Sequence, residues 1–282
     1  MKVQFTKMNG LGNDFIILDG INNTLPEDLC DFAKKVCDRH FGIGADGVLV
    51  ILPSDIFDIR MRIINSDGTY AQMCGNGIRC FAAYVYENGL LDKTDMKVET
   101  DAGMIRPHLI FNGDAVERVE VDMGVPRLDS WAIPVNVGDP KVVSYPHMTA
   151  AVGEIELTCV SMGNPHVVTF WKTLEEAPFT TLGPELEADE MFPEKANVEF
   201  VEILGEKEIR VRVFERGCGE TLACGTGACA ATVASVLNGL TGRELTVHLS
   251  GGDLLCRWAE NDHLFMSGPF AFVAEGTYEY AE

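Results

Sequence analysis

Two cysteines that share a local pattern carry the strongest chemical signal in the sequence. Cys74 and Cys224 each open a Cys-Gly-x-Gly motif, and an alanine-rich segment follows each motif. Such a segment is typical of a buried helix, so each cysteine is expected at the amino end of one. Backbone N–H groups and the helix dipole favour an anion there, which lowers the pKa of a thiol and suits it to act as a base.

Two such thiols together can do what one cannot. A thiolate removes a proton from carbon while a thiol on the opposite side delivers one, and the stereocentre between them is inverted. Two close thiols that share a proton titrate as a coupled pair. The glycines of both motifs also let backbone N–H groups approach a carboxylate closely. The pattern therefore predicts proton transfer on a small molecule that carries a carboxylate.

The two motifs belong to an internal repeat. Residues 59–90 align with residues 209–240 without a gap, and nine positions are identical, including both cysteines and an Arg-x-Arg pattern. A slightly shifted offset relates Gly12-Asn13 to Gly163-Asn164. A repeat of this size predicts two copies of one structural unit, each about half the chain.

Each copy changes from strand to helix periodicity. Alternating polar and apolar residues predict a strand before each cysteine, and the alanine-rich segments predict helices that end at Asn-Gly. We therefore predict the α+β class, with two pseudo-symmetric lobes from an internal duplication, each a curved sheet or barrel wrapped around a central buried helix. The expected lobes are residues 1–123 with 268–282, which carry Cys74, and residues 124–267, which carry Cys224.

Composition narrows the range of partners. The 282 residues carry a net charge of −21 and are 46% hydrophobic, as in a globular protein with ample core. The negative charge repels nucleic-acid backbones and anionic membrane surfaces, and no Lys/Arg-rich run offsets it. The amino terminus has no apolar leader pattern, and the longest uncharged run, residues 221–242, is too polar to span a bilayer. We expect a cytoplasmic protein that binds neither nucleic acid nor membrane.

Nine cysteines, an odd number in a large chain, favour reduced thiols over a disulfide framework. Inert burial is the expected state for seven of them: Cys30, Cys37, Cys80, Cys159, Cys218, Cys229 and Cys256. The spacings Cys74-x5-Cys80 and Cys218-x5-Cys224 do not suit zinc, because six residues along a helix move a ligand by about 9 Å. No metal is therefore expected.

Two further segments receive no function. Residues 42–47 match the string Gly-x-Gly-x-x-Gly, but a helix-like segment precedes it and a strand-like segment follows, which reverses the order of a dinucleotide-binding fingerprint. We interpret this string as a turn. Residues 174–194 contain seven acidic residues, three prolines and no Lys or Arg, and we interpret them as a solvated connection.

The motifs closely resemble those of diaminopimelate epimerase, a family of cofactor-independent amino-acid epimerases, along essentially the whole chain. Besides both cysteine motifs, the resemblance rests on Gly12-Asn13-Asp14-Phe15, Asn65-Ser66-Asp67-Gly68, Ser161–His166, Ala196–Phe200 and Glu215-Arg216-Gly217. It implies reversible conversion of LL- to meso-diaminopimelate, for lysine and peptidoglycan precursors. It also implies a homodimer in which Cys74 and Cys224 are the acid/base pair, with neither pyridoxal phosphate nor metal.

The resemblance assigns contacts at the reacting end of the substrate. Asn13 serves the reacting amino acid. Removing the proton next to a carboxylate creates an enolate-like charge, which preorganised backbone amides can stabilise. These amides belong to Gly75, Asn76, Gly225 and Thr226.

The resemblance also assigns the distal end. The distal carboxylate goes to Asn65, Asn164, Asn197 and Arg216, and the distal ammonium goes to Glu215. Arginine suits this role because its guanidinium binds a carboxylate through two parallel hydrogen bonds. His166 and Glu215 are expected beside the thiols, where they tune which sulfur carries the proton.

Two positions depart from the family pattern. Some members carry Gln where Gly47 stands here, so one side-chain contact to substrate is missing or replaced. Members also have Tyr near the carboxyl terminus at a dimer contact, where this chain has Ala274.

Other function classes fit parts of the pattern. A racemase of proline or hydroxyproline shares the two-thiol chemistry, but a ring substrate has no distal ammonium for Glu215. An isomerase relative without the thiols is disfavoured because both cysteines are present. A thiol redox switch or binding module, in which Cys74 and Cys224 form a disulfide, belongs to a different class. We expect that disulfide as an inactivating side reaction if the sulfurs approach within bonding range.

Overall fold

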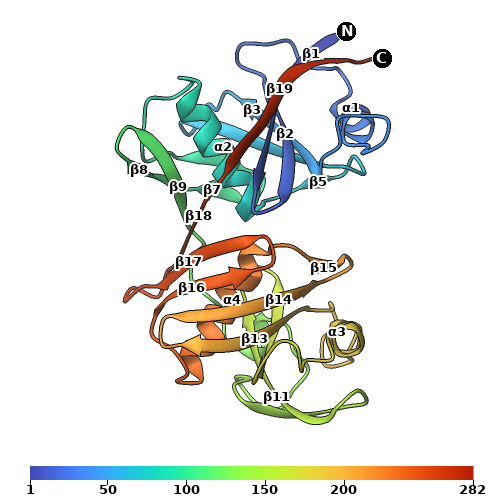
Figure 1. Ribbon diagram of the computed structural model, residues 1–282, viewed down its shortest axis with the longest axis vertical. Helices are drawn as coiled ribbons and strands as arrows, with labels where there is room; N and C mark the ends of the chain where they lie inside the picture. Colours follow the sequence, from blue (N-terminus) through green and yellow to red (C-terminus); the bar gives the residue numbers. More distant parts are fainter. Residues whose placement is uncertain (282) are drawn as a thin grey trace. The chain divides into compact units, whose positions relative to one another are not determined.

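The computed structural model describes residues 1–281. The chain divides into two compact units, one of Met1–Val121 with the segment from Gly268 onward, and one of Asp122–Ser267. Each unit combines a mixed β-sheet with two α-helices in the described chain (Figure 1). The predicted α+β class is therefore confirmed.

The first unit is built on one sheet with the strand order β19-β1-β2-β3-β4-β6-β7, and the short strand β5 pairs with β4. The last strand runs antiparallel to the first, which brings the two ends of the chain side by side (Figure 1). A hairpin of β8 and β9 completes the unit. The strands are β1 (Lys2–Gly10), β2 (Asn13–Asp19), β3 (Gly47–Leu52), β4 (Ile59–Asn65), β5 (Tyr70–Ala71), β6 (Val98–Thr100), β7 (Gly103–Ile105), β8 (Pro107–Asn112), β9 (Ala115–Asp122) and β19 (Ala271–Glu279).

The second unit repeats this order from β10 to β18. Its sheet runs β10-β11-β12-β13-β14-β16-β17-β18, and β15 pairs with β14. A 3-10 turn, η1 (Ser130–Ala132), precedes the sheet. The strands are β10 (Tyr145–Thr149), β11 (Gly153–Ser161), β12 (Pro165–Trp171), β13 (Asn197–Gly205), β14 (Glu208–Glu215), β15 (Gly219–Thr221), β16 (Glu244–Leu249), β17 (Gly252–Trp258) and β18 (Leu264–Gly268).

The duplication extends beyond the aligned residues, because the two sheets share one mixed pattern of strand directions. Strands β2 and β3 are parallel, as are β4 and β6. The same holds for β12 with β13 and for β14 with β16. A parallel pair needs a crossover connection, and in both units the second crossover contains the helix that follows a cysteine motif.

One face of each sheet covers that helix. Helix α2 (Gly75–Glu87) packs against β1, β2, β3 and β8, and helix α4 (Gly225–Leu237) packs against six strands from β11 to β17. The run Ala228–Ser235 of α4 is buried at every position. Small side chains allow the surrounding strands to approach such a helix on all sides, so the predicted central buried helix is confirmed in both units.

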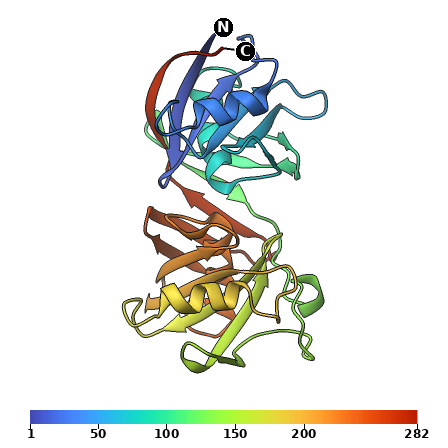
Figure 2. The same ribbon diagram turned by 90° about the vertical axis from the view of Figure 1, so that its right-hand side faces the viewer.

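The other face of each sheet carries a second helix (Figure 2). Helix α1 (Leu29–Val36) packs its apolar face, including Phe32, over the first sheet. Helix α3 (Phe179–Glu187) occupies the equivalent place over β13 and β14. Each sheet therefore lies between two helices.

Helix α3 overturns the interpretation of residues 174–194 as a solvated connection. Phe179, Leu182 and Leu186 are buried in a core cluster with Val198 and Phe200. These apolar residues recur at helical spacing, whereas the acidic residues of the segment lie mostly on the outer side. The high acidic content and the prolines concealed this narrow apolar stripe.

The Gly42–Gly47 string is confirmed as a turn rather than a dinucleotide fingerprint. It connects α1 to β3, so the helix comes first. A Cβ atom at Gly42 would lie 2.3 Å from the carbonyl oxygen of Lys35, which explains the need for glycine there. Among residues 1–281, no helix is long and apolar enough to cross a membrane.

The buried face of α3 yields a stability prediction. Leu182→Ala removes a fully buried side chain and should destabilise the protein by about 2–5 kcal/mol. Thr180→Ala, on the exposed side of the same helix, should change the free energy of unfolding by less than about 0.5 kcal/mol. Urea unfolding followed by circular dichroism measures both. Equal midpoints for the two variants would mean that α3 contributes no core.

Candidate active site

Both motif cysteines occupy the N-cap position of their helix. Cys74 precedes α2 and Cys224 precedes α4, each with an extended backbone. In each case the sulfur accepts a hydrogen bond from the backbone N–H three residues later, from Gly77 and Gly227, at 3.4 Å. The predicted placement of both thiols at helix amino ends is therefore observed.

The two thiols differ in burial. Cys74 is half-buried, whereas the Cys224 residue is only 7% exposed. Burial raises the pKa of Cys224 well above the usual thiol value, and the negative field of Glu215 and Glu199 adds to this shift. Hydrogen bonds from Thr226 and Gly227 lower it, but they do not compensate. For Cys224 without substrate, the expectation of a depressed pKa is therefore wrong, because loss of hydration outweighs the helix dipole.

A chain of polar contacts leads from Cys224 into the core of the second unit. The sulfur lies 3.5 Å from Thr226 Oγ1, which accepts from Asn164 Nδ2 at 3.4 Å. Asn164 Oδ1 lies 3.0 Å from His166 Nε2, and His166 Nδ1 lies 2.7 Å from Glu199 Oε1. The structure thus places His166 two hydrogen-bonded residues away from the thiol rather than in direct contact with it.

Glu199 is a residue that the sequence did not single out as functional. Both its side chain and that of His166 are fully buried. Burial raises the pKa of Glu199, and the proximity of His166 opposes this effect only in part. A Cβ atom at Gly227 would lie 2.8 Å from Glu199 Oε1, so this carboxyl group packs directly against the first turn of α4. Sequence motifs alone give no sign of the contact between Glu199 and α4, because Glu199, on β13, and this helix are 26 or more residues apart in the chain.

The proposed distal residues gather at the end of β14. Asn197 is buried, and its amide donates to Pro165 O at 2.9 Å and accepts from Arg216 N at 3.0 Å. The exposed Arg216 donates to Glu194 O at 2.9 Å. Glu215 accepts a short hydrogen bond from Thr221 Oγ1 at 2.5 Å. The segment that was interpreted as a mere connection therefore supports the arginine.

The first unit assembles Asn13 with Cys74 and Asn76. Asn13 opens β2 after a two-residue hairpin turn in which Leu11 and Gly12 both have positive φ. Its Oδ1 lies 3.6 Å from Cys74 Sγ and accepts from Asn76 Nδ2 at 3.3 Å. Its Nδ2 donates to Asp46 Oδ2 at 2.6 Å. Asn13 therefore stands beside the thiol of Cys74.

Asn65 lies near this group, as the last residue of β4. Its Nδ2 donates to Thr69 Oγ1 at 3.0 Å, and the next residue, Ser66, donates its N–H to Asp46 O. Gly47 pairs with Asn65 across β3 and β4, and a Cβ atom at Gly47 would lie 2.7 Å from Ile64 O. The close approach of two strands therefore explains why this chain has glycine where some members have a side chain.

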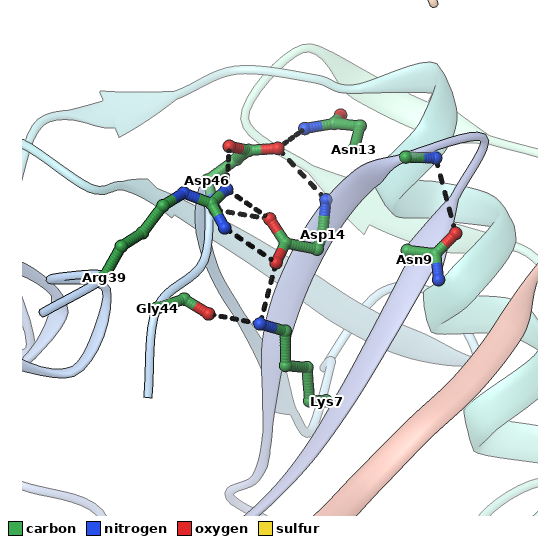
Figure 3. Close-up of polar contacts among 8 residues, drawn as sticks. Lys7, Asn9, Asn13, Asp14, Arg39, Gly44 and Asp46 are labelled. Atoms are coloured by element: carbon green, nitrogen blue, oxygen red, sulfur yellow. Dashed lines mark hydrogen bonds and ion pairs between the residues drawn. The ribbon is translucent and has the colours of Figure 1, made fainter. Parts of the chain in front are cut away.

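A charged cluster that sequence reasoning missed adjoins Asn13 through Asp46 (Figure 3). Arg39 Nη2 donates to Asp14 Oδ1 at 2.7 Å and to Asp46 Oδ1 at 2.8 Å. Lys7 Nζ lies 2.8 Å from Asp14 Oδ2. Burial raises the pKa of Asp14, but the hydrogen bonds and charges of Arg39 and Lys7 outweigh it and hold this pKa below the usual value.

Five of the seven remaining cysteines are buried, as predicted, and two are not. Burial raises the pKa of both Cys37 and Cys80 to about 12. Cys218 is exposed and Cys30 is half-buried, so inert burial is wrong for these two. Cys218 lies in the turn after β14, where no second layer covers it. Among the residues that the structure describes, no group of three His, Cys, Asp or Glu side chains is arranged to hold a metal ion.

Comparison with known proteins decides the family. The sequence profile of diaminopimelate epimerase matches residues 5–128 and 158–273. The diaminopimelate epimerase of Pelotomaculum thermopropionicum is 50% identical over 279 residues, covering 99% of both chains. That of Moorella thermoacetica is 49% identical, covering 98% of this chain and 99% of the relative. The chain belongs to the diaminopimelate epimerase family.

Solved structures that share the fold of this diaminopimelate epimerase family member include proteins of low sequence identity to it. A PhzF-family phenazine biosynthesis protein of Bacillus anthracis superposes with a TM-score of 0.69 at 18% identity, covering 99% of this chain and 100% of that one. A hydroxyproline epimerase of Agrobacterium vitis gives 0.64 at 14% identity, covering 98% and 92%. These similarities confirm the duplicated two-lobe fold.

Equivalent glycines in the two helices should respond differently to alanine. At Gly77 a Cβ atom meets Leu49 Cδ2 at 3.3 Å, whereas at Gly227 it meets the Glu199 carboxyl at 2.8 Å. Gly227→Ala should therefore destabilise the protein by about 1–3 kcal/mol, because Glu199 must move away from His166. Gly77→Ala should be near neutral, because a gain of about 0.5–1 kcal/mol in helix propensity offsets the tight contact. Thermal unfolding compares the pair, and equal losses would contradict the tight contact at Glu199.

The raised pKa of Cys224 predicts its reactivity. Because the thiol form persists to high pH, alkylation of Cys224 by iodoacetamide in substrate-free protein should be slow at pH 8 and still accelerate at pH 10. Peptide mass spectrometry measures the rate, with N-acetylcysteine as the reference thiol in the same buffers. A rate that levels off near pH 7 would show that the helix dipole, not burial, dominates.

Proposed function

We propose that this protein interconverts LL- and meso-2,6-diaminopimelate without a cofactor, using Cys74 and Cys224 as its acid/base pair. Membership of the diaminopimelate epimerase family supports the reaction. The observation that carries the residue assignment is the N-cap placement of both sulfurs, each with its own hydrogen bond from a backbone N–H. This reaction serves lysine and peptidoglycan precursors, and we therefore expect the protein in the cytoplasm. By its resemblance to the family, we also expect a homodimer.

The proposed proton transfer is balanced between the two sulfurs. One cysteine, as thiolate, removes the α-proton and becomes a thiol, leaving an electron pair delocalised into the carboxylate. The other cysteine, as thiol, gives its proton to the opposite face of that carbon and becomes a thiolate. The product has inverted configuration, and the enzyme ends with its two protonation states exchanged. Proton exchange with water then resets the enzyme.

The high pKa of Cys224 fits the acid role in the direction in which Cys224 gives up its proton. Because its pKa is raised, Cys224 stays protonated and can give its proton to the carbanion. The hydrogen bonds from Thr226 and Gly227 stabilise the thiolate that remains. Water exclusion around this sulfur strengthens those hydrogen bonds. The same burial that hinders ionisation of Cys224 in the free enzyme thus favours rapid transfer of its proton to the carbanion.

The amino ends of the two helices are proposed to hold the reacting carboxylate. The N–H groups of Gly75, Asn76, Gly225 and Thr226 lie in the first turns, where no intrahelical acceptor exists for them. Fixed N–H dipoles at this position stabilise the enolate-like charge without reorganising. Asn13 then serves the reacting amino acid from beside Cys74.

The distal end of the substrate is proposed to bind Asn65, Asn164, Asn197, Arg216 and Glu215. Arg216 is anchored through Glu194 and through Asn197, which binds its backbone N–H. Glu215 provides the negative charge for an ammonium group. A substrate that lacks these distal groups would leave buried polar atoms unpaired, which favours a long, doubly zwitterionic amino acid over a ring.

Exchange of the α-proton tests the proposal. LL-diaminopimelate in heavy water, with reductant and chelator, should take up deuterium with inversion in the presence of the protein. Cys74→Ala and Cys224→Ala should each lower this epimerisation by about 10²-fold or more. Cys30→Ala, which alters a half-buried cysteine on α1, is the matched control and should retain activity. Folded, reduced protein that exchanges no deuterium would reject this substrate in favour of proline-type racemisation or thiol binding.

A further inference from the structure

Asp46 touches the asparagine that stands beside Cys74. Asn13 bridges the two, with Oδ1 3.6 Å from Cys74 Sγ and Nδ2 2.6 Å from Asp46 Oδ2. An ionised carboxylate only accepts hydrogen bonds, so the amide nitrogen of Asn13 must be the atom that faces Asp46. The carbonyl oxygen of Asn13 consequently faces the thiol.

Asp46 itself is held by charge and by backbone. The N–H of Asp14 donates to Asp46 Oδ2 at 3.0 Å, and Arg39 donates to the other carboxylate oxygen at 2.8 Å. Arg39 also binds Asp14, which pairs with Lys7, and Lys7 donates to Gly44 O at 2.6 Å. Two acidic and two basic side chains thus form a charge-balanced network that meets the Asn13 amide through Asp46 (Figure 3).

We propose that Asp46 is a positioning residue, which fixes the Asn13 carbonyl toward Cys74 and thereby favours the S–H form of that cysteine in the substrate-free enzyme. A carbonyl oxygen accepts a hydrogen bond from S–H, whereas an amide N–H in the same place would stabilise the thiolate. The inference rests on the proposed role of Cys74 in proton transfer. Arg39 contributes by occupying the second oxygen of Asp46.

The equivalent asparagine in the second unit shows that the duplication does not dictate this orientation. Asn164 turns its oxygen toward His166 and its nitrogen toward Thr226, beside Cys224. The two copies therefore present opposite amide atoms on the side of the cysteine. In the first unit the Asp46 carboxylate, which accepts from the Asn13 nitrogen, and the Asn76 amide, which donates to the Asn13 oxygen, both favour this choice.

Asp46→Asn provides the test. The amide oxygen at position 46 should turn to Arg39, which only donates, so that its NH2 group faces Asn13 and reverses the Asn13 amide. Alkylation of Cys74 at pH 7.5, measured by peptide mass spectrometry, should then become several-fold faster. The kcat/KM for epimerisation should fall by about 10-fold or more, because the Asn13 amide that serves the reacting amino acid is then reversed.

Two controls separate positioning from a general loss of structure. In an Asn13→Ala background, Asp46→Asn should have no further effect on either measurement, because the group through which it acts is gone. Asp58→Asn is the matched surface variant, since Asp58 also binds a lysine and a backbone N–H. It lies about 20 Å along β4 from Asn65 and should leave both measurements unchanged.

Several outcomes would overturn the inference. Unchanged or slower alkylation of Cys74 in Asp46→Asn is one, and an equal effect of the substitution with and without Asn13 is another. If Asp46→Asn does not fold, the nuclear magnetic resonance signal of the Asn13 side-chain amide in the unsubstituted protein tests the orientation instead. A carboxylate-bound N–H proton resonates downfield and exchanges slowly, and a signal typical of exposed asparagine refutes the orientation. Alkylation and resonance need no turnover, so failure of the proposed function is distinguishable from failure of this inference.

Discussion

A sulfur atom held at the amino end of a buried helix is the arrangement on which the rest of the site depends. In both units the N–H of the third helical residue donates to the cysteine sulfur at the same distance. Each of these helices packs against the strands of its unit, and small side chains let α4 be covered along its whole central length. The first-turn glycines are part of the same constraint, because at Gly227 the Glu199 carboxyl occupies the space of a Cβ atom.

Around that shared arrangement the two units have diverged electrostatically. The first surrounds its thiol with a partly exposed frame of two acids and two bases, in which opposite charges are satisfied pairwise. The second places a fully buried Glu199–His166 pair and a nearby Glu215 behind Cys224. Burial of the Cys224 thiol raises its pKa, and the nearby negative charges of Glu215 and Glu199 add to this shift. The two equivalent cysteines therefore stand in different electrostatic surroundings.

Part of the excess of acidic residues in this chain has a structural role. Several of its carboxylates accept backbone N–H groups at turns rather than facing solvent alone, as Glu187 does for Gly217 and Asp38 does for His40. The acid-rich segment around α3 thus supports the turn that carries Arg216. Backbone N–H groups at irregular turns need acceptors, and ionised side chains are the strongest ones available.

Much of the architecture follows from the sequence alone. The repeat, the helix starts at Cys74 and Cys224, and the order of helix and strand around residues 42–47 are local patterns, so periodicity and turn chemistry determine them. Helix α3 was not predicted, because its apolar stripe is narrow and lies among acidic residues and prolines. The stripe consists of Phe179, Leu182 and Leu186.

Other features depend on contacts between residues far apart in the chain, and only the tertiary structure decided them. Glu199 meets His166 because β12 and β13 are neighbours, and Asp46 meets Asn13 because β2 and β3 are. The direction of the Cys224 pKa shift depends on how much water the surrounding strands exclude, a quantity that no local pattern encodes. The sequence determined the family and the helix starts at the two cysteines, whereas burial and non-local hydrogen bonds determined the orientation and charge of the groups around them.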